Sequence, residues 1–493
     1  MAPQSYRPKL FESGVFLVAL TTLVYAAAVL FSEKIAINGG FGFDGAIYGE
    51  WANTFPGPLF DGSVNRYYIQ RVVPSLVIHG TLRLLRLEPT PAHVIHLFEG
   101  WAIGLVCATA SIWLALARRL RLTTAARWFG AAALFGSYAS LKWTAYYPVL
   151  TDLWSIVIAL LQLLLFLDRR LVLLALVTFV GAFTWPTSTS IGAVLIVFLP
   201  LPTAGAGPPV PLPARLRFLP AGVAVVAWTL FCASIVKSGY APPDGLAPIY
   251  RPLLRLSFLA SGGFLFAAVA VLIDDRALFD RRTLARYLLR PNLLVAAAVV
   301  VAAHAIQARL APTPSPYPFD EQLRTTAFTS IQKPAVFIVA HVMFLGPLVL
   351  VMVMRGRAVI DLARRWGPGL VAVATLGAFL ALSSESRHLW NVAAMFVPFA
   401  VKLLDERGWT PRQFFWLGAL TLALSNVWLI YEDPIWPNAL EFPGQLFFMT
   451  NGPWMNMTMY VTQAAIVAVI GFWLARQLRA VERPAATSPD SAR

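Results

Sequence analysis

Residues 94–121 read VIHLFEGWAIGLVCATASIWLALARRLR. Residues 94–117 are mostly apolar, and the basic cluster RRLR follows them at once. A bilayer core ~30 Å thick needs roughly 20 helical residues to cross it. Basic residues next to a membrane helix favour its cytoplasmic end. The stretch therefore predicts a membrane-spanning helix with residues 118–121 in the cytoplasm.

The composition of the whole chain agrees with this interpretation. Of 493 residues, 58% are hydrophobic and only 13% are charged, against ~25% charged in an ordinary soluble protein. So few charges exclude a soluble chain of several domains. Cys107 and Cys232 both lie in apolar runs. That placement is typical of small core residues and not of a disulfide framework or a metal site.

Thirteen other stretches resemble the first, and several are short for a full crossing. We therefore expect an all-α, polytopic transmembrane helix bundle with about 14 spans, in a range of 11 to 14. The predicted spans are residues 14–31, 94–117, 126–142, 153–167, 171–185, 188–201, 218–236, 257–273, 292–308, 335–354, 367–382, 391–404, 413–431 and 458–475.

The net charge of +15 needs an explanation before any partner is named. With a cytoplasmic N-terminus and alternating sides, the cytoplasmic connections hold most of the 39 Lys and Arg residues. The excess is thus a topology signal, and it gives no reason to invoke nucleic acid. We expect both termini in the cytoplasm, an uncleaved first span, one transmembrane domain over residues 1–475, and a disordered cytoplasmic tail over residues 476–493.

The connection over residues 32–93 is external in this arrangement and too long for a simple link, so it should have its own helices and a task. Asp44, Tyr48 and Trp51 recur at helical spacing after a glycine-rich stretch. One reading is a general base beside an aromatic surface on which a sugar stacks. The other is that Asp44 only caps a short surface helix.

A second pattern within this connection is a row of polar residues four positions apart. Arg71, Ser75, His79 and Arg83 form the row, and apolar residues occupy the other side. Such a helix is expected to lie in the membrane interface with its cations near the headgroups. The row would bind either the phosphate of a lipid-linked substrate or anionic lipid.

Two further groups lie at the external side. His96 and Glu99 share a helix face near the outer end of a span, where a carboxylate needs a partner or a wet cavity. Residues 142–152, KWTAYYPVLTD, place Lys142, Tyr147 and Asp152 at the membrane edge. The aromatic residues among them equally suit an interfacial belt.

Residues 383–388, SSESRH, form the last external group. Arg387 offers a planar fork suited to phosphate, Glu385 is placed to orient it, and His388 follows. A local salt bridge between Glu385 and Arg387 explains the same pattern. No P-loop, GxSxG, HExxH or zinc-type cysteine spacing is present in the sequence.

The order of these features resembles the GT-C superfamily of integral-membrane glycosyltransferases. FDGAIYGEWA at 43–52 and the residues after it resemble the family loop that carries an essential acidic residue. YPVLTD resembles a second acidic motif, and SSESRHLW resembles a loop that holds the lipid phosphate. The resemblance implies a catalytic role for Asp44, with Asp152 near the same cleft and Arg387 and His388 on the phosphate. No adjacent acidic pair follows the first span, so either Glu50 supplies a second carboxylate or one suffices. A divalent cation is therefore left open.

The expected function is transfer of a sugar from a polyprenyl-phosphate donor to an acceptor hydroxyl of a glycan, lipid or protein on the external face, with Asp44 as general base. The remaining candidates for substrate contact are Tyr48, Glu50, Trp51, Arg71, His79, His96, Glu99, Lys142, Tyr147 and Glu385. The expected location is the inner membrane of a bacterial cell envelope. A multi-span transporter or lipid flippase, or a polymerase or ligase of lipid-linked glycans, are the alternatives.

Overall fold

The computed structural model describes residues 10–200, 212–240, 251–274, 281–427 and 452–482. In these ranges the chain is helical, without a β-strand. The helices up to residue 200 are η1 (Leu10–Glu12), α1 (Gly14–Phe31), η2 (Ile37–Gly40), α2 (Asp44–Thr54), α3 (Gly57–Phe60), η3 (Ile69–Arg71), α4 (Val72–Leu85), α5 (Pro91–Arg119), α6 (Thr124–Phe135), η4 (Ala139–Trp143), α7 (Thr144–Tyr146), α8 (Asp152–Leu167), α9 (Leu171–Gly181) and α10 (Pro186–Val197).

The helices after residue 200 are α11 (Ala214–Lys237), η5 (Arg251–Leu253), α12 (Leu254–Leu272), α13 (Arg281–Leu288), α14 (Pro291–Leu310), α15 (Phe319–Ile331), α16 (Val336–Leu345), α17 (Leu348–Met354), α18 (Gly356–Arg364), α19 (Pro368–Leu380), α20 (Ser386–Glu406), α21 (Pro411–Leu424), η7 (Gly452–Trp454) and α23 (Met457–Glu482).

Each of the fourteen predicted spans lies mainly on helix where it is described. Residue 201 of the sixth span and residues 428–431 of the thirteenth lie outside the described residues. Two of the spans are interrupted. Residues 126–142 form α6 and the π-helix η4, and residues 335–354 are broken at Gly346 and Pro347. The coarser prediction, an all-helical chain with several helices long and apolar enough to cross a membrane, is confirmed for the described residues.

The lengths of the helices divide the predicted spans into two groups. Among the described residues, α1, α5, α11, α12, α14 and α23 are long and apolar enough to cross a membrane, and the pair α15–α16, bent by 95°, makes a seventh if it is one span. The apolar helices α8, α9, α10 and α19 have only 16, 11, 12 and 13 residues. At 1.5 Å per residue they are shorter than a ~30 Å core, so fourteen crossings remain a prediction.

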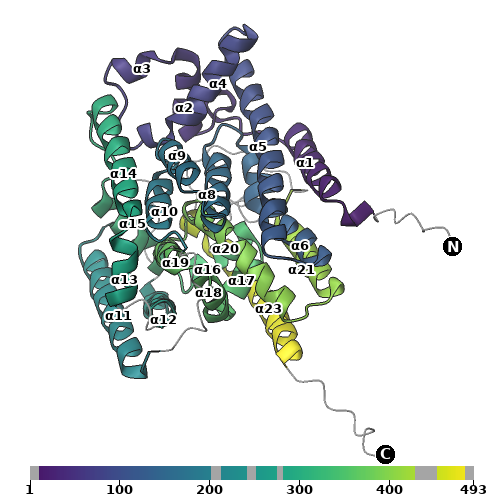
Figure 1. The fold of residues 1–493 in the computed structure, drawn as a ribbon, viewed down its shortest axis with the longest axis vertical. Helices are drawn as coiled ribbons and strands as arrows, with labels where there is room; N and C mark the ends of the chain where they lie inside the picture. The colour runs from purple at the N-terminus through teal and green to yellow at the C-terminus, as the bar shows by residue number, and fades with distance from the viewer. Residues whose placement is uncertain (1–9, 201–211, 241–250, 275–280, 428–451, 483–493) are drawn as a thin grey trace, which may run out of the picture.

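Helix α20 lies near the centre of the bundle (Figure 1), with α6, α8, α16 and α19 packed around it. Most of its side chains are buried. Because its first turn carries residues 386–388, the packing of this helix fixes the position of the last group that the sequence singled out.

The connection over residues 32–93 folds into helices, as its length predicts. α2, α3 and α4 lie together at one end of the molecule (Figure 1). Side chains of α4 hold α2: Ser75 Oγ donates to the carbonyl of Tyr48, and His79 Nδ1 lies 2.9 Å from the carbonyl oxygen of Ala52. Pro74 is accommodated because it lies in the first turn of α4, where its missing N–H costs no helical hydrogen bond.

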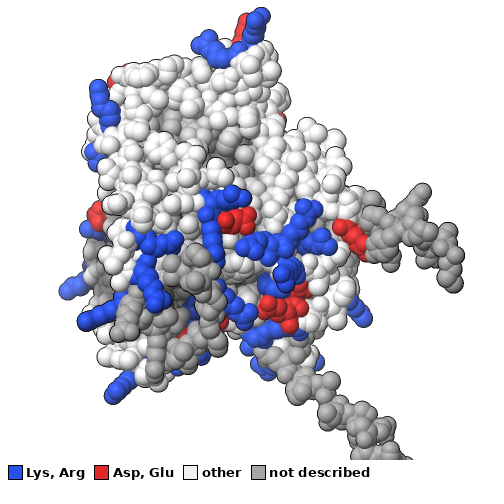
Figure 2. Space-filling model, in the orientation of Figure 1, with Lys and Arg blue, Asp and Glu red and all other residues white. Residues whose placement is uncertain are grey.

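Charged residues are unevenly distributed over the surface. On the face shown in Figure 2, Lys and Arg gather over the lower half, and most of the upper half is uncharged. The helices α2–α4 lie at the upper end. One ionic contact is centred on a buried carboxylate: Asp274 Oδ2 lies 2.6 Å from Arg217 and 2.7 Å from Arg357.

One sequence expectation needs correction at the C-terminus. The tail predicted to be disordered from residue 476 begins as helix, since α23 continues to Glu482. Leu478 is buried, and Gln477 accepts a hydrogen bond from Gln413 of α21. These contacts and the good helix propensity of Arg, Gln, Leu and Ala extend the helix. Residues 483–493 lie outside the described residues. Cys107 and Cys232 are free cysteines.

A glycine of α6 gives a test of the packing. A Cβ at Gly130 would lie 2.0 Å from Cζ2 of Trp113, a fully buried side chain. We expect Gly130→Ala to lower the free energy of unfolding by about 1–3 kcal/mol because the indole has no room to move. Thermal unfolding of the purified protein in detergent measures the effect.

The matched control is Gly222→Ala in α11, where an added Cβ meets nothing within 4 Å. Alanine is the better helix former by ~1 kcal/mol, so this variant should melt at or above the wild-type temperature. Equal melting of the two variants would contradict the packing of α6 against α5.

Candidate functional site

Asp44 is positioned by close packing against the segment that precedes α8. Gly42 has φ 73°, and a Cβ there would lie 2.3 Å from the ring of Tyr147, so only glycine fits. The backbone N–H of Gly45 donates to Tyr147 Oη at 2.9 Å. The two acidic segments predicted from the sequence, around Asp44 and Asp152, are therefore neighbours.

The centre of the site is Arg387, which binds two carboxylates. Its Nη1 and Nη2 donate to Oδ2 of Asp44 at 3.2 and 3.3 Å, and its Nε donates to Oε1 of Glu385 at 2.5 Å. Asp44 and Arg387 are 343 positions apart in the sequence. The salt bridge to Glu385 that explained the SSESRH pattern is present, and the same guanidinium also reaches Asp44, whose side chain is 27% exposed.

Arg387 and Glu385 each stabilise the charged form of the other. Burial raises the pKa of Glu385, but His388 and Arg387 outweigh it and hold that pKa below its ordinary value. Burial lowers the pKa of Arg387, yet Glu385 and Asp44 raise it well above the ordinary value. Both groups are therefore ionised at neutral pH. Burial lowers the pKa of His388, whose Nε2 lies 3.6 Å from Glu385 Oε1, against the opposing effect of that carboxylate.

Arg71 is a second buried cation, beside the cluster formed by Asp44, Glu385 and Arg387. It is 4% exposed, and its guanidinium lies 4.0 Å from the ring centre of Tyr67 and 5.1 Å from that of Trp185. Its Nη1 donates to the carbonyl of Tyr67. Burial lowers its pKa, but Tyr67, Tyr48 and Asp44 shift the balance upward. The side chain is thus a fixed positive charge held between aromatic rings.

Asp152 differs from the other carboxylates because no strong partner compensates its burial. It precedes the apolar stretch 153–167 and is 1% exposed, and among the described residues Oδ1 accepts no hydrogen bond. Burial raises its pKa to about 6, although the charges of Arg387 and Arg71 oppose the shift. Because Arg387 and Arg71 act on its carboxylate, we count Asp152 as a member of the cluster around Asp44.

Two aromatic residues do not have the role that the sequence suggested. Tyr48 and Trp51 were expected to offer a stacking surface, but they are only 1% and 6% exposed. Both pack against Tyr68, with ring centres 6.2 and 6.1 Å apart. They are core residues of the loop because α4 covers their face of α2. Glu50 is exposed on another face of α2, six positions from Asp44, so it does not join the carboxylates.

The polar row of α4 also needs correction. Its cations were expected near the lipid headgroups, but Arg71 is buried and Ser75 and His79 bind the backbone of α2. Only Arg83 is exposed. The row faces the protein because α2 has backbone carbonyls to satisfy there, while Leu84, 81% exposed, lies on the outer side.

Three other predicted residues lie in separate ionic contacts. Glu99 binds Lys34 Nζ at 2.9 Å and His96 Nδ1 at 3.0 Å. Buried Lys142 lies 3.8 Å from Glu33. Since Glu33 and Lys34 lie two and three residues after the end of α1, the pairs fasten that helix to α5 and η4. They give His96, Glu99 and Lys142 a structural explanation.

Sequence reasoning missed two supports of the site. Tyr67 lies four residues before Arg71, and this helical spacing was the available signal. His341 of α16 is buried; Nε2 lies 3.0 Å from the carbonyl oxygen of Ala381, and Nδ1 lies 2.9 Å from Ser386 Oγ. A carbonyl only accepts, so Nε2 donates and Nδ1 accepts from Ser386. This links the end of α19 to the start of α20, and no local sequence pattern indicates it.

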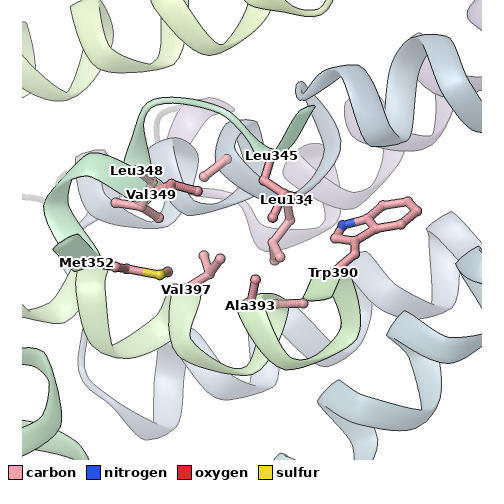
Figure 3. A pocket seen from close by; sticks show the side chains of 10 residues that line it. Leu134, Leu345, Leu348, Val349, Met352, Trp390, Ala393 and Val397 are labelled. Atoms are coloured by element: carbon pink, nitrogen blue, oxygen red, sulfur yellow. The ribbon is translucent and has the colours of Figure 1, made fainter. Parts of the chain in front are cut away.

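An apolar pocket lies between α6, α16, α17 and α20 (Figure 3). Its lining has no ionisable side chain. Trp390, in its wall, is three residues from Arg387 and thus about one helical turn along α20. The residues labelled in Figure 3 are Leu134, Leu345, Leu348, Val349, Met352, Trp390, Ala393 and Val397.

Within the described residues, no group of three or more His, Cys, Asp and Glu side chains is arranged to hold a metal ion. No family model, curated protein or solved structure matches the chain.

The contrast between Asp152 and Asp274, two buried aspartates, yields a prediction. An acid whose folded-state pKa lies above its unfolded value of 3.8 binds its proton more tightly when folded. Stability therefore falls as pH rises from about 4 to about 6. We expect Asp152→Asn to remove this penalty and to raise the free energy of unfolding at pH 7.5 by about 1–3 kcal/mol. Its advantage should vanish near pH 4. Thermal unfolding at both pH values measures it.

Asp274→Asn is the matched comparison, because this equally buried carboxylate is paired with Arg217 and Arg357. Removal of its charge should destabilise the fold at pH 7.5. A loss of stability in both variants would refute the assignment of Asp152 as an uncompensated buried acid.

Proposed function

We propose that the protein is a membrane glycosyltransferase that resembles the GT-C superfamily. It transfers a sugar from a polyprenyl-phosphate donor to an acceptor hydroxyl, and Asp44 is the general base. The observation that carries the proposal is the contact of Asp44 with Arg387. Two sequence motifs 343 positions apart meet in one cluster, together with Asp152, Glu385 and Arg71.

The geometry suits this chemistry. Asp44 is partly exposed and binds Arg387 through Oδ2, so Oδ1 is the oxygen that faces an incoming hydroxyl. As the acceptor oxygen bonds to the anomeric carbon, its proton passes to Asp44. The bond from the anomeric carbon to the phosphate oxygen breaks, and its electron pair stays on the phosphate. The products are a glycoside and a polyprenyl phosphate.

The two arginines suit the leaving group. A departing phosphate is stabilised by fixed cations in a site that excludes water, and Arg387 and Arg71 are both held by neighbouring groups. The donor is amphiphilic, with a charged head and an apolar chain. The apolar pocket at Trp390 lies about one helical turn along α20 from Arg387, so apolar surface occurs on the same helix as the proposed phosphate contact.

The finer architecture belongs to the same proposal. The chain would form one GT-C-like bundle with up to fourteen crossings, its termini in the cytoplasm and the cluster at the external face of a bacterial inner membrane. The helices α2–α4 at the end away from most basic residues on the face in Figure 2 support this orientation. Metal dependence is not part of the proposal.

A transporter or flippase is the second candidate, and the broken pair α15–α16 favours it. The helices meet at 95°, and Gln332 and Lys333 at the break are 4% and 2% exposed. Discontinuous helices with buried polar residues form the substrate sites of many transporters. A polymerase or ligase of lipid-linked glycans would also use Arg71 and Arg387, but with less dependence on one carboxylate.

Replacement of Asp44 by Asn separates these candidates. Purified protein in nanodiscs is given polyprenyl-phosphate hexoses and pentoses with a mixture of glycan acceptors, and release of polyprenyl phosphate is measured. We expect release by the wild type and a loss of at least about 100-fold in Asp44→Asn, because the hydroxyl loses its base.

Asp61→Asn is the control, since it removes the same charge from an exposed position of the same loop and keeps an oxygen for the N–H of Ser63. It should act as the wild type does. Full activity of Asp44→Asn in folded protein would exclude Asp44 as the base. Movement of intact lipid-linked sugar across the bilayer without release would favour the transporter.

A further inference from the structure

We propose that Tyr317 forms a stacking platform for a saccharide acceptor beside the Asp44–Arg387 cluster. The inference rests on the proposed function, since it names the substrate class for the acceptor side of the same site. It begins from residues 311–318, APTPSPYP, which connect α14 to α15 and which the proposed chemistry does not use.

The sequence makes this connection stiff. Proline occupies positions 312, 314, 316 and 318. Each proline fixes its own φ and also restricts the preceding residue to extended conformations. Little conformational entropy remains to be lost when a ligand binds, so a side chain on this connection is already in place.

The connection is bound to the loop that carries Asp44. Thr313 forms an isolated bridge with Asn65, in which the N–H of Arg66 donates to the carbonyl of Thr313 at 3.0 Å. Ser315 Oγ accepts from the N–H of Tyr317 at 3.1 Å. Ala311 is fully buried. The first half of the segment is thereby fixed to the loop that carries Asp44, and Tyr317 is held by a hydrogen bond within the segment.

Tyr317 reaches the cluster through Tyr67. The two ring centres are 5.1 Å apart, and the guanidinium of Arg71 lies 4.0 Å from the ring centre of Tyr67. The charges of Arg71, Arg387 and Asp44 all act on the Tyr67 phenol. Tyr67 is half-buried, whereas Tyr317 is 46% exposed. An aromatic surface thus extends from Arg71 through Tyr67 and Tyr317 to solvent.

A saccharide fits this surface better than other ligands. The C–H face of a sugar ring packs on an aromatic ring, while its hydroxyls reach polar groups such as the hydroxyl of the tyrosine and nearby carboxylates. A cationic ligand would be repelled by Arg71 and Arg387. A lipid chain would leave the exposed polar side chain of Thr313 without water. A peptide acceptor is the remaining rival.

The test uses the full-length protein, fluorescently labelled in nanodiscs, on an oligosaccharide array. We expect the wild type to bind at least one saccharide, and Tyr317→Ala to weaken that binding about tenfold. Tyr317→Phe keeps the ring and should retain most of it. Phe60→Ala removes an exposed aromatic side chain from α3, in the loop that carries Asp44. This variant should bind as the wild type does.

The outcomes decide separately for the platform and for the proposed function. Binding of no saccharide by the wild type, or equal binding by folded Tyr317→Ala, overturns the platform, as does capture of acceptor peptides alone. The same nanodiscs are tested for release of polyprenyl phosphate from lipid-linked sugars. Release of polyprenyl phosphate without saccharide binding would support the transferase and refute the platform. Tyr317-dependent saccharide binding without release would support a carbohydrate-binding surface and refute the transferase.

Discussion

The positive charge of Arg387 is the constraint on which the rest of the site depends. A guanidinium that is 18% exposed needs carboxylates around it, and it obtains them from its own loop and from α2. Because α20 runs through the middle of the bundle, this charge is fixed to a helix most of whose side chains are buried. The helices α2–α4 are therefore not merely a cover. They supply Asp44 to a cation that the core has already positioned.

Close packing of backbone and aromatic rings maintains this arrangement. Gly42 allows Tyr147 to lie directly on the chain before α2, and the N–H of Gly45 binds its hydroxyl. On the other side, Tyr67 and Trp185 enclose Arg71. Aromatic rings hold cations and exclude water without adding charge. The site thus keeps two arginines close to three carboxylates, Asp44, Asp152 and Glu385, at low local dielectric, where each charge acts strongly on the others.

The sequence predicted the helices well, because apolar runs and glycine or proline breaks are local signals. Residues 14–31 and the helix that starts at Asp44 coincide with α1 and α2. The sequence patterns also indicated Asp44, Asp152, Glu385 and Arg387 as site residues, and the fold brings these four together. It misjudged Tyr48, Trp51 and the row on α4, because their faces depend on how α2 and α4 pack. The contacts of Tyr317 with Tyr67 and of His341 with Ser386 join distant segments, and no periodicity encodes such pairs.

On the proposed function, the geometry of Arg387 couples phosphate recognition to the base. Its Nε is held by Glu385, while both Nη atoms are committed to Oδ2 of Asp44. A donor phosphate would compete for the Nη atoms. The exchange would release Asp44 from Arg387 only when the donor is present, and Oδ1 of Asp44 would then take the proton of the acceptor hydroxyl. Glu385 would keep the guanidinium from swinging away meanwhile. A lysine cannot act in this way, because an ammonium group lacks the planar fork that binds two partners in fixed directions. On this proposal, Arg387 lies between two carboxylates and therefore connects the base, Asp44, with the phosphate contact, although the two come from distant parts of the chain.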